Sequence, residues 1–241
     1  MTDAVMPAPP AQGLLARAIG ILTSPRRTFQ GVVSHPLPIG IAFLSAVVIA
    51  LATGLPQFSD RGRQAVLDMQ VQQIEKFTGQ PVSDEMYTTL QARSKYSAYW
   101  TLVSVFIFVP IGAIVFAGIY WGWFNVVLGG TASFKQVLAI STHTLVIGAL
   151  AAVLAAPIQY LTGTMSTSGP FNLAALVPML PEKSFLVEFL SFINPFTVWS
   201  IVVTAIGLSV LYKRKASRIS MWLLGIYVLL IAAIATYLAS R

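Results

Sequence analysis

The sequence predicts an all-α fold: a polytopic membrane bundle of five transmembrane helices, with an N-terminal interfacial amphipathic helix and a small external helical loop. Three observations predict it. Hydrophobic residues make up 56% of the 241 residues and charged residues only 10%, whereas soluble domains carry about 25% charged residues. The mean hydropathy is +0.76. Apolar residues also occur in blocks of the roughly 20 residues that a helix needs to cross a bilayer, and capping or basic residues stand at the ends of these blocks.

Five apolar blocks are long enough to span a membrane. The second is flanked by aromatic residues, which settle at both membrane interfaces: Tyr99 and Trp100 at its start, and Trp121 and Trp123 near its end. The predicted spans are residues 37–55, 99–128, 134–161, 196–212 and 219–238.

Turn chemistry marks how these spans are joined. Ser133 and Gln136 form the S-x-x-Q pattern of a capping box after Gly129, so the second and third spans should form a tight hairpin. Asn194 is a predicted N-cap and Pro195 the first helical residue of the fourth span. The fourth and fifth spans should form a second hairpin through a basic turn.

The distribution of Lys and Arg predicts the orientation. With the N-terminus inside, eight cations lie on the inner side and seven on the outer side, so the totals decide little. The inner cations crowd into short segments beside helices, whereas five of the outer seven lie in one 41-residue loop, 57–97, together with five acids. Only short, helix-flanking clusters orient spans effectively. We therefore expect a cytoplasmic N-terminus and an external C-terminus.

Two regions outside the spans precede and interrupt the bundle. Residues 1–12 lack the basic start and apolar core of a signal peptide and are expected to be a disordered, uncleaved tail. Residues 14–22 carry apolar residues at helical spacing, with Arg17 predicted on the other side, as in a helix that lies flat in the interface. In 57–97, apolar stripes predict two helices separated by Gly79 and Pro81.

The residues available for chemistry exclude several classes of site. The chain has no cysteine and only two histidines, His35 and His143, so thiolate metal sites and a Cys nucleophile are excluded. No Asp or Glu falls within a predicted span, which argues against an intramembrane protease or a carboxylate-driven pump. We expect no enzymatic activity, no metal and no cofactor. The net charge is +7, and the cations that produce it flank membrane helices. We therefore expect anionic lipid headgroups, and no nucleic acid, as partner. The predicted headgroup contacts are Lys213, Arg214, Lys215 and Arg218.

Three polar residues at membrane depth are candidates for a functional site: His143, Thr142 and Asn125. His143 follows the Ser133 cap by about 15 Å of helix and should lie near the bilayer centre, where ionisable residues are often functional. The alternative is structural: a neutral His143 bonded between helices, and Asn125 in packing near the helix end. Gly118 and Gly122 form a G-x-x-x-G pair, which permits close packing within the bundle or a homo-oligomer.

Three motifs resemble the Yip domain family of five-span membrane proteins, whose name refers to interaction with Ypt/Rab GTPases. They are LLARAIGILTSPRRTF, GGTASFKQVLAIST and INPFTVWSIVVTAIGLSVLYKRKAS. The resemblance is closer to bacterial than to eukaryotic members and covers most of the chain from Leu14 onward, except for the outer loop. It implies residues 13–241 as one five-span domain in a bacterial cytoplasmic (inner) membrane, a cytoplasmic N-terminus and no accepted enzymatic activity.

Two functions follow from these observations. The first is a non-enzymatic membrane protein that organises the membrane or recruits lipid, membrane-protein or peripheral-protein partners. The second is a small transporter or lipid-translocating protein that uses a polar intramembrane cavity near His143, with Pro110 opening the second span.

Overall fold

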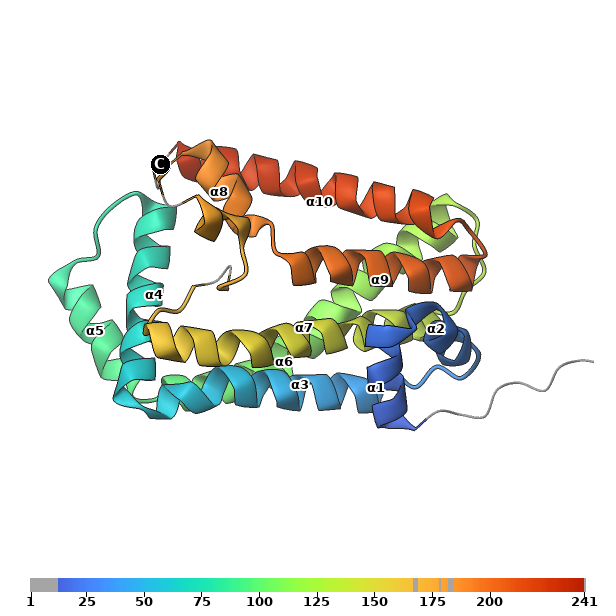
Figure 1. The fold of residues 1–241 in the computed structure, drawn as a ribbon, viewed down its shortest axis with the longest axis horizontal. Helices are drawn as coiled ribbons and strands as arrows, with labels where there is room; N and C mark the ends of the chain where they lie inside the picture. The colour runs from blue at the N-terminus through green and yellow to red at the C-terminus, as the bar shows by residue number, and fades with distance from the viewer. Residues whose placement is uncertain (1–12, 167–168, 178, 182–183, 241) are drawn as a thin grey trace, which may run out of the picture.

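Five long helices form the body of the structure, a computed structural model that describes residues 13–166, 169–177, 179–181 and 184–240. These helices run side by side along the longest axis (Figure 1), and no strand occurs in the described residues. Each is long and apolar enough to cross a membrane. The predicted disordered tail, residues 1–12, lies outside the described residues. The long helices are α3 (Pro38–Gly54), α6 (Ser97–Trp121), α7 (Phe134–Thr162), α9 (Pro195–Tyr212) and α10 (Ala216–Ala239).

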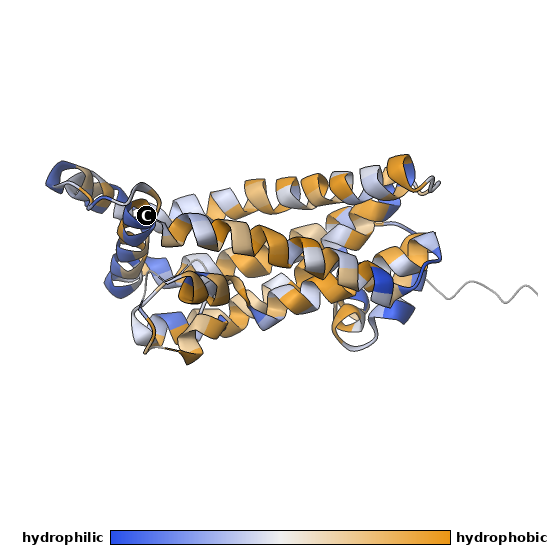
Figure 2. Ribbon diagram, turned by 90° about the horizontal axis from the view of Figure 1, so that it is seen from above, coloured by the Kyte–Doolittle hydropathy of each residue, from blue (hydrophilic) through white to orange (hydrophobic). Residues whose placement is uncertain are grey.

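The five predicted spans are confirmed, with ends that differ by a few residues. Helix α3 continues into the 3-10 turn η1 (Leu55–Phe58), and α6 continues into the π-helix η2 (Gly122–Val127). Polar residues are concentrated at the two ends of the bundle, while the long helices are apolar along their length (Figure 2). This distribution matches a bilayer, whose hydrocarbon core is about 30 Å thick.

Helix α7 is the centre of the bundle. Half of its most apolar 18-residue stretch is buried, against 11% for α6 and 17% for α10. It packs against α3, α6 and α9, while α10 packs on α9. The outer faces of α6 and α10 therefore have no covering helix among the described residues, and they present large apolar side chains to the surroundings. In a membrane these faces contact lipid.

The predicted helix starts are confirmed by their hydrogen bonds. The capping box of α7 is complete: the Gln136 backbone N–H donates to Ser133 Oγ at 3.3 Å, and the Ser133 N–H donates to Gln136 Oε1 at 2.9 Å. At the start of α9, the Phe196 N–H donates to Asn194 Oδ1 at 2.9 Å. These side chains replace partners that the first turn of a helix lacks.

The two ends of the bundle differ in structure (Figure 1). One end, called here the basic end, carries α1 (Leu14–Thr23), α2 (Pro25–Ser34) and the turns 128–133 and 213–215. The other, called the loop end, carries η1 and the described residues of 163–194. It also carries the two helices predicted for the outer loop, α4 (Asp60–Thr78) and α5 (Asp84–Ser94). Segment 163–194 contains η3 (Leu173–Leu176) and α8 (Phe185–Phe192).

An ion pair connects the outer loop to α8, in the segment between the third and fourth spans. Lys76 Nζ of α4 lies 2.5 Å from Glu188 Oε2 of α8, and the Glu188 side chain is only 7% exposed. Helix α4 runs across the end of the bundle (Figure 1), and three of its own residues are buried: Ala65, Val66 and Leu67. The outer loop is therefore packed on the bundle.

The N-terminal region differs from the sequence prediction in two ways. A second short helix, α2, which was not predicted, begins at Pro25, because proline is accommodated in the first turn of a helix. The prediction for Arg17 was also wrong. Arg17 shares the face of α1 that packs on the bundle with Ala18 and the fully buried Ile21, whereas Leu15 and Ile19 point outward.

The G-x-x-x-G pair of α6 does not pack within the bundle. A Cβ placed on Gly118 or on Gly122 would meet no atom of the described residues within 4 Å. These glycines lie on the poorly covered surface of α6, so their spacing plays no part in the packing of one chain.

Candidate functional site

His143 lies in the middle of α7 and is fully buried. Its Nδ1 is 2.7 Å from the Ala139 carbonyl oxygen. A carbonyl oxygen can only accept, so Nδ1 carries the proton and donates. The neighbouring Thr142 hydroxyl also donates to Ala139 O, at 3.1 Å. Both bonds stay within one helix. Next to them, the Thr204 hydroxyl of α9 donates to Thr144 Oγ1 of α7 at 3.2 Å, which joins the two helices.

Several buried polar atoms of the helices have no hydrogen-bond partner among the described residues. They include Nε2 of His143 and the hydroxyl oxygens of Ser45 and Ser141. Nε of Arg17 in α1 is also buried and has no hydrogen-bond partner among the described residues. A buried polar atom without a partner costs about 1–3 kcal/mol. Among these atoms, Nε2 belongs to His143, the central residue of the candidate polar site.

Asn125 belongs to a different site, at the basic end. Its Nδ2 donates to the Ala132 carbonyl oxygen at 2.6 Å, and its Oδ1 accepts from the Tyr212 hydroxyl at 2.9 Å. Trp121 donates to the same carbonyl oxygen at 3.0 Å. The Phe124 and Tyr212 rings stack with centroids 4.6 Å apart. Asn125 therefore joins the turn between α6 and α7 to the end of α9, and its polar groups are used in packing.

The four candidate headgroup contacts are all exposed, in and just after the turn between α9 and α10. Lys213 ends α9 with a positive φ of 52° and Lys215 precedes α10. Arg214 donates to the Leu128 carbonyl oxygen at 3.4 Å, so one of these cations also contacts the neighbouring turn. Arg26, Arg27 and Lys135 are exposed at the same end. All the acids in the described residues lie at the loop end: Asp60, Asp68, Glu75, Asp84, Glu85 and Glu188.

Gly207 of α9 is the point at which three separate segments meet. A Cβ on Gly207 would lie 2.6 Å from Ile140 Cγ2 of α7 and 3.1 Å from two ring atoms of Phe29 of α2. Phe29 and Ile140 are both fully buried. Only a residue without a side chain permits this approach. The contact brings together the N-terminal pair of helices, the central helix and the fourth span.

Comparison with known families identifies the domain that these elements form. Residues 19–238 match the Yip1 domain, which is nearly the whole chain. The chain belongs to the Yip1 domain family. No curated protein and no solved structure matched it. Phe29, Ile140 and Gly207 each come from one of the three Yip-like motifs of the sequence, so in this Yip1 domain the motifs include residues that pack on one another.

The sequence prediction missed the residues that join elements far apart in the chain. Gln136 was predicted only as a cap, yet its Nε2 also donates to the Val33 carbonyl oxygen of α2 at 3.1 Å. Tyr212 and Phe29 were not singled out. The motif resemblance could have indicated Phe29 and Gly207, because a motif residue without chemical reactivity is commonly a packing residue. No sequence signal pairs Asn125 with Tyr212.

Proposed function

We propose that this Yip1 domain protein is a non-enzymatic membrane protein of the bacterial cytoplasmic membrane that organises anionic lipid, and the partners recruited there, through its basic end. The separation of charge supports this proposal most directly. Seven exposed cations lie at the basic end of the described structure, and every described acid lies at the other end. Each Lys or Arg near an anionic leaflet contributes about 1 kcal/mol of attraction.

Helix α1 supports the same role. Leu15 and Ile19, one turn apart, are 68% and 62% exposed on the face away from the bundle. A short helix with outward apolar side chains beside cations is suited to insertion at the level of the headgroups. Arg26 and Arg27 are the exposed cations that follow it. The basic end thus combines exposed apolar side chains on α1 with exposed cations.

The same arrangement supports an orientation with the basic end, and hence the N-terminus, in the cytoplasm and the C-terminus outside, since short basic segments beside spans remain on the inner side. The described residues contain no group of three or more side chains suited to hold a metal ion.

The open Gly118–Gly122 surface of α6 is available for a homo-oligomer.

Energy transfer between a labelled residue and labelled lipid tests the proposal. Ser217→Cys places a dye in the basic turn, because Ser217 is exposed and the chain has no native cysteine. In reconstituted vesicles, transfer to labelled phosphatidylglycerol should exceed transfer to labelled phosphatidylcholine. Replacing Lys213, Arg214, Lys215 and Arg218 by Gln should remove most of that excess, as should high salt.

The control is a variant in which the four cations are exchanged, Lys for Arg and Arg for Lys. It should keep the excess, because lipid attraction depends on charge. Equal transfer to both lipids in the unmodified turn would contradict the proposal. Loss of the excess in the exchanged variant would indicate a partner that distinguishes the two side chains by geometry.

Lipid translocation is the second candidate function, favoured by the unpartnered buried atoms of His143, Ser45 and Ser141. A polar route for a headgroup would need such atoms at membrane depth. Translocation of fluorescent phospholipid in vesicles, compared between the native chain and His143→Leu, tests it. Activity that the substitution abolishes would favour this function, and absence of activity in the native chain would remove it.

A further inference from the structure

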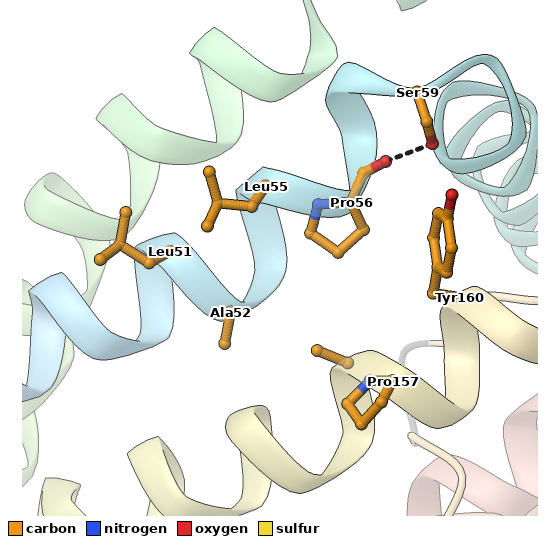
Figure 3. A pocket seen from close by; sticks show the side chains of 8 residues that line it. Leu51, Ala52, Leu55, Pro56, Ser59, Pro157 and Tyr160 are labelled. Carbon is orange, nitrogen blue, oxygen red and sulfur yellow. Dashed lines mark hydrogen bonds between the residues drawn. The ribbon is translucent and has the colours of Figure 1, made fainter.

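An apolar groove lies between α3 and α7 at the loop end (Figure 3), well away from the basic end. Its volume is about 450 Å³, within the range of roughly 300–1,000 Å³ that small-molecule sites occupy. A second hollow of about 310 Å³ shares four of its lining residues and extends it toward Val48 and Val153. The residues that line the groove are Leu51, Ala52, Leu55, Pro56, Ser59, Ala156, Pro157 and Tyr160.

The groove arises from the sequence of the two helices. In α7, buried residues stop at Ala149, although the helix continues to Thr162. Beyond that point the lining places alanines on both helices, Ala52 and Ala156, and small side chains leave space between the two backbones. Leu51 and Leu55 remain 46% and 56% exposed at its edge. The groove is open and faces the surroundings of a transmembrane span, which are hydrocarbon.

The mouth of the groove carries a cation. Arg61, near the start of α4, lies with its guanidinium 6.0 Å from the centroid of the Tyr160 ring, and Tyr160 lines the groove. Arg61 Nη2 donates to the Leu161 carbonyl oxygen at 2.5 Å, which holds the guanidinium over the end of α7. The neighbouring cation Arg63 is paired with Asp60. No ion pair of Arg61 occurs in the described part of the chain, so its positive charge is uncompensated there.

We propose that this groove binds a phospholipid, with one acyl chain along α3 and α7 and the phosphate on Arg61. The apolar lining fits methylene groups, and the cation stands where the span ends and the headgroup region begins. Arg can donate two parallel hydrogen bonds to a phosphate, and Arg61 uses one donor atom on Leu161. A second copy of the chain would have to insert a helix into the groove. A helix with its side chains is about 10–12 Å across, so even a 10 Å length of it occupies roughly 800 Å³ or more, which exceeds the volume of the groove.

Binding is measured by native mass spectrometry of the full chain, purified in detergent, delipidated and titrated with phosphatidylglycerol. We expect Arg61→Gln to weaken binding about fivefold, the effect of one cation near an anionic lipid. Ala156→Leu should abolish binding at this site by filling the groove. Arg93→Gln removes an exposed cation of α5 that does not line the groove, so it is the matched control for charge and should leave binding unchanged. Circular dichroism and gel filtration show whether each variant is folded.

A phosphatidylglycerol with a photoreactive group in its acyl chain locates the site in the unmodified protein, at one lipid per chain. Cross-links should map to residues 48–59 and 153–160. Cross-links spread over α6 and α10 would overturn the proposal, because they would indicate only the general lipid layer. Equal binding by native chain and Arg61→Gln, or binding that survives Ala156→Leu at these residues, would overturn it as well. Because the site is at the loop end, these outcomes do not depend on the role proposed for the basic end.

Discussion

The ring of Phe29 packs directly on the backbone of Gly207, so that a Cβ at this glycine would lie 3.1 Å from ring atoms Cε2 and Cζ. Phe29 is in α2, near the N-terminus, and Gly207 is in the fourth span. With Ile140 of α7 they form a contact between three elements that are distant in sequence. This contact holds the short helix α2 against the basic end of the bundle. Helix α1, which is joined to α2, is thereby kept at the same end, where we propose that it lies in the membrane interface.

Gly207→Ala should destabilise the protein by about 1–3 kcal/mol. The added methyl group would overlap Ile140, which is fully buried and has little room to move. Thermal unfolding in detergent measures the effect. Gly118→Ala is the matched control, also a helical glycine but in open space. It should be neutral or slightly stabilising, since Ala favours helix over Gly; equal losses in both variants would contradict the packing account.

Removing the hydroxyl of Tyr212 should cost about 1 kcal/mol, because Tyr212→Phe loses the hydrogen bond to Asn125 but keeps the ring stacked on Phe124. Asn125→Ala should cost more, about 2 kcal/mol, because the bond to Ala132 is lost as well. The double variant should be less destabilised than the sum, as expected for groups in one network. Strict additivity in thermal unfolding would show that the two side chains act independently.

His143→Leu should leave stability unchanged or raise it by up to about 1 kcal/mol. The substitution replaces a fully buried side chain by an apolar one and removes Nε2, which has no partner among the described residues. Unfolding of purified protein provides the measurement. A decrease of more than about 2 kcal/mol in the free energy of unfolding would contradict this account. It would mean that Nε2 makes a favourable contact in the native protein, such as with a water molecule.

The loop end should be accessible from outside the cell and the basic end should not. Gln72 in α4 and Ser217 beside the basic turn are both exposed, and the chain has no cysteine to interfere. An impermeant thiol reagent on intact cells should label Gln72→Cys and miss Ser217→Cys, which should react only after permeabilisation. The reverse pattern would invert the proposed orientation.

The spans were predictable from sequence because their causes are local. A block of apolar residues must be helical in hydrocarbon, where every backbone polar group needs an internal partner. The ends of the helices follow from side chains within three residues of the cap, as at Ser133 and Asn194. The two helices of the outer loop were also predictable, since their apolar stripes and the break at Gly79 and Pro81 are local signals.

Which side of each helix is covered was decided only by the tertiary structure. Arg17 was expected to face away from the bundle, but the packing of α1 on α7 buries its Nε and leaves Leu15 and Ile19 outside. The hydrogen bond between Asn125 and Tyr212 likewise joins residues 87 positions apart. In a membrane, apolar side chains are stable both inside the bundle and facing lipid. Hydrophobicity alone therefore determines that α3, α6, α7, α9 and α10 span the bilayer, while side-chain shape, as at Gly207 and Ala156, determines how they meet.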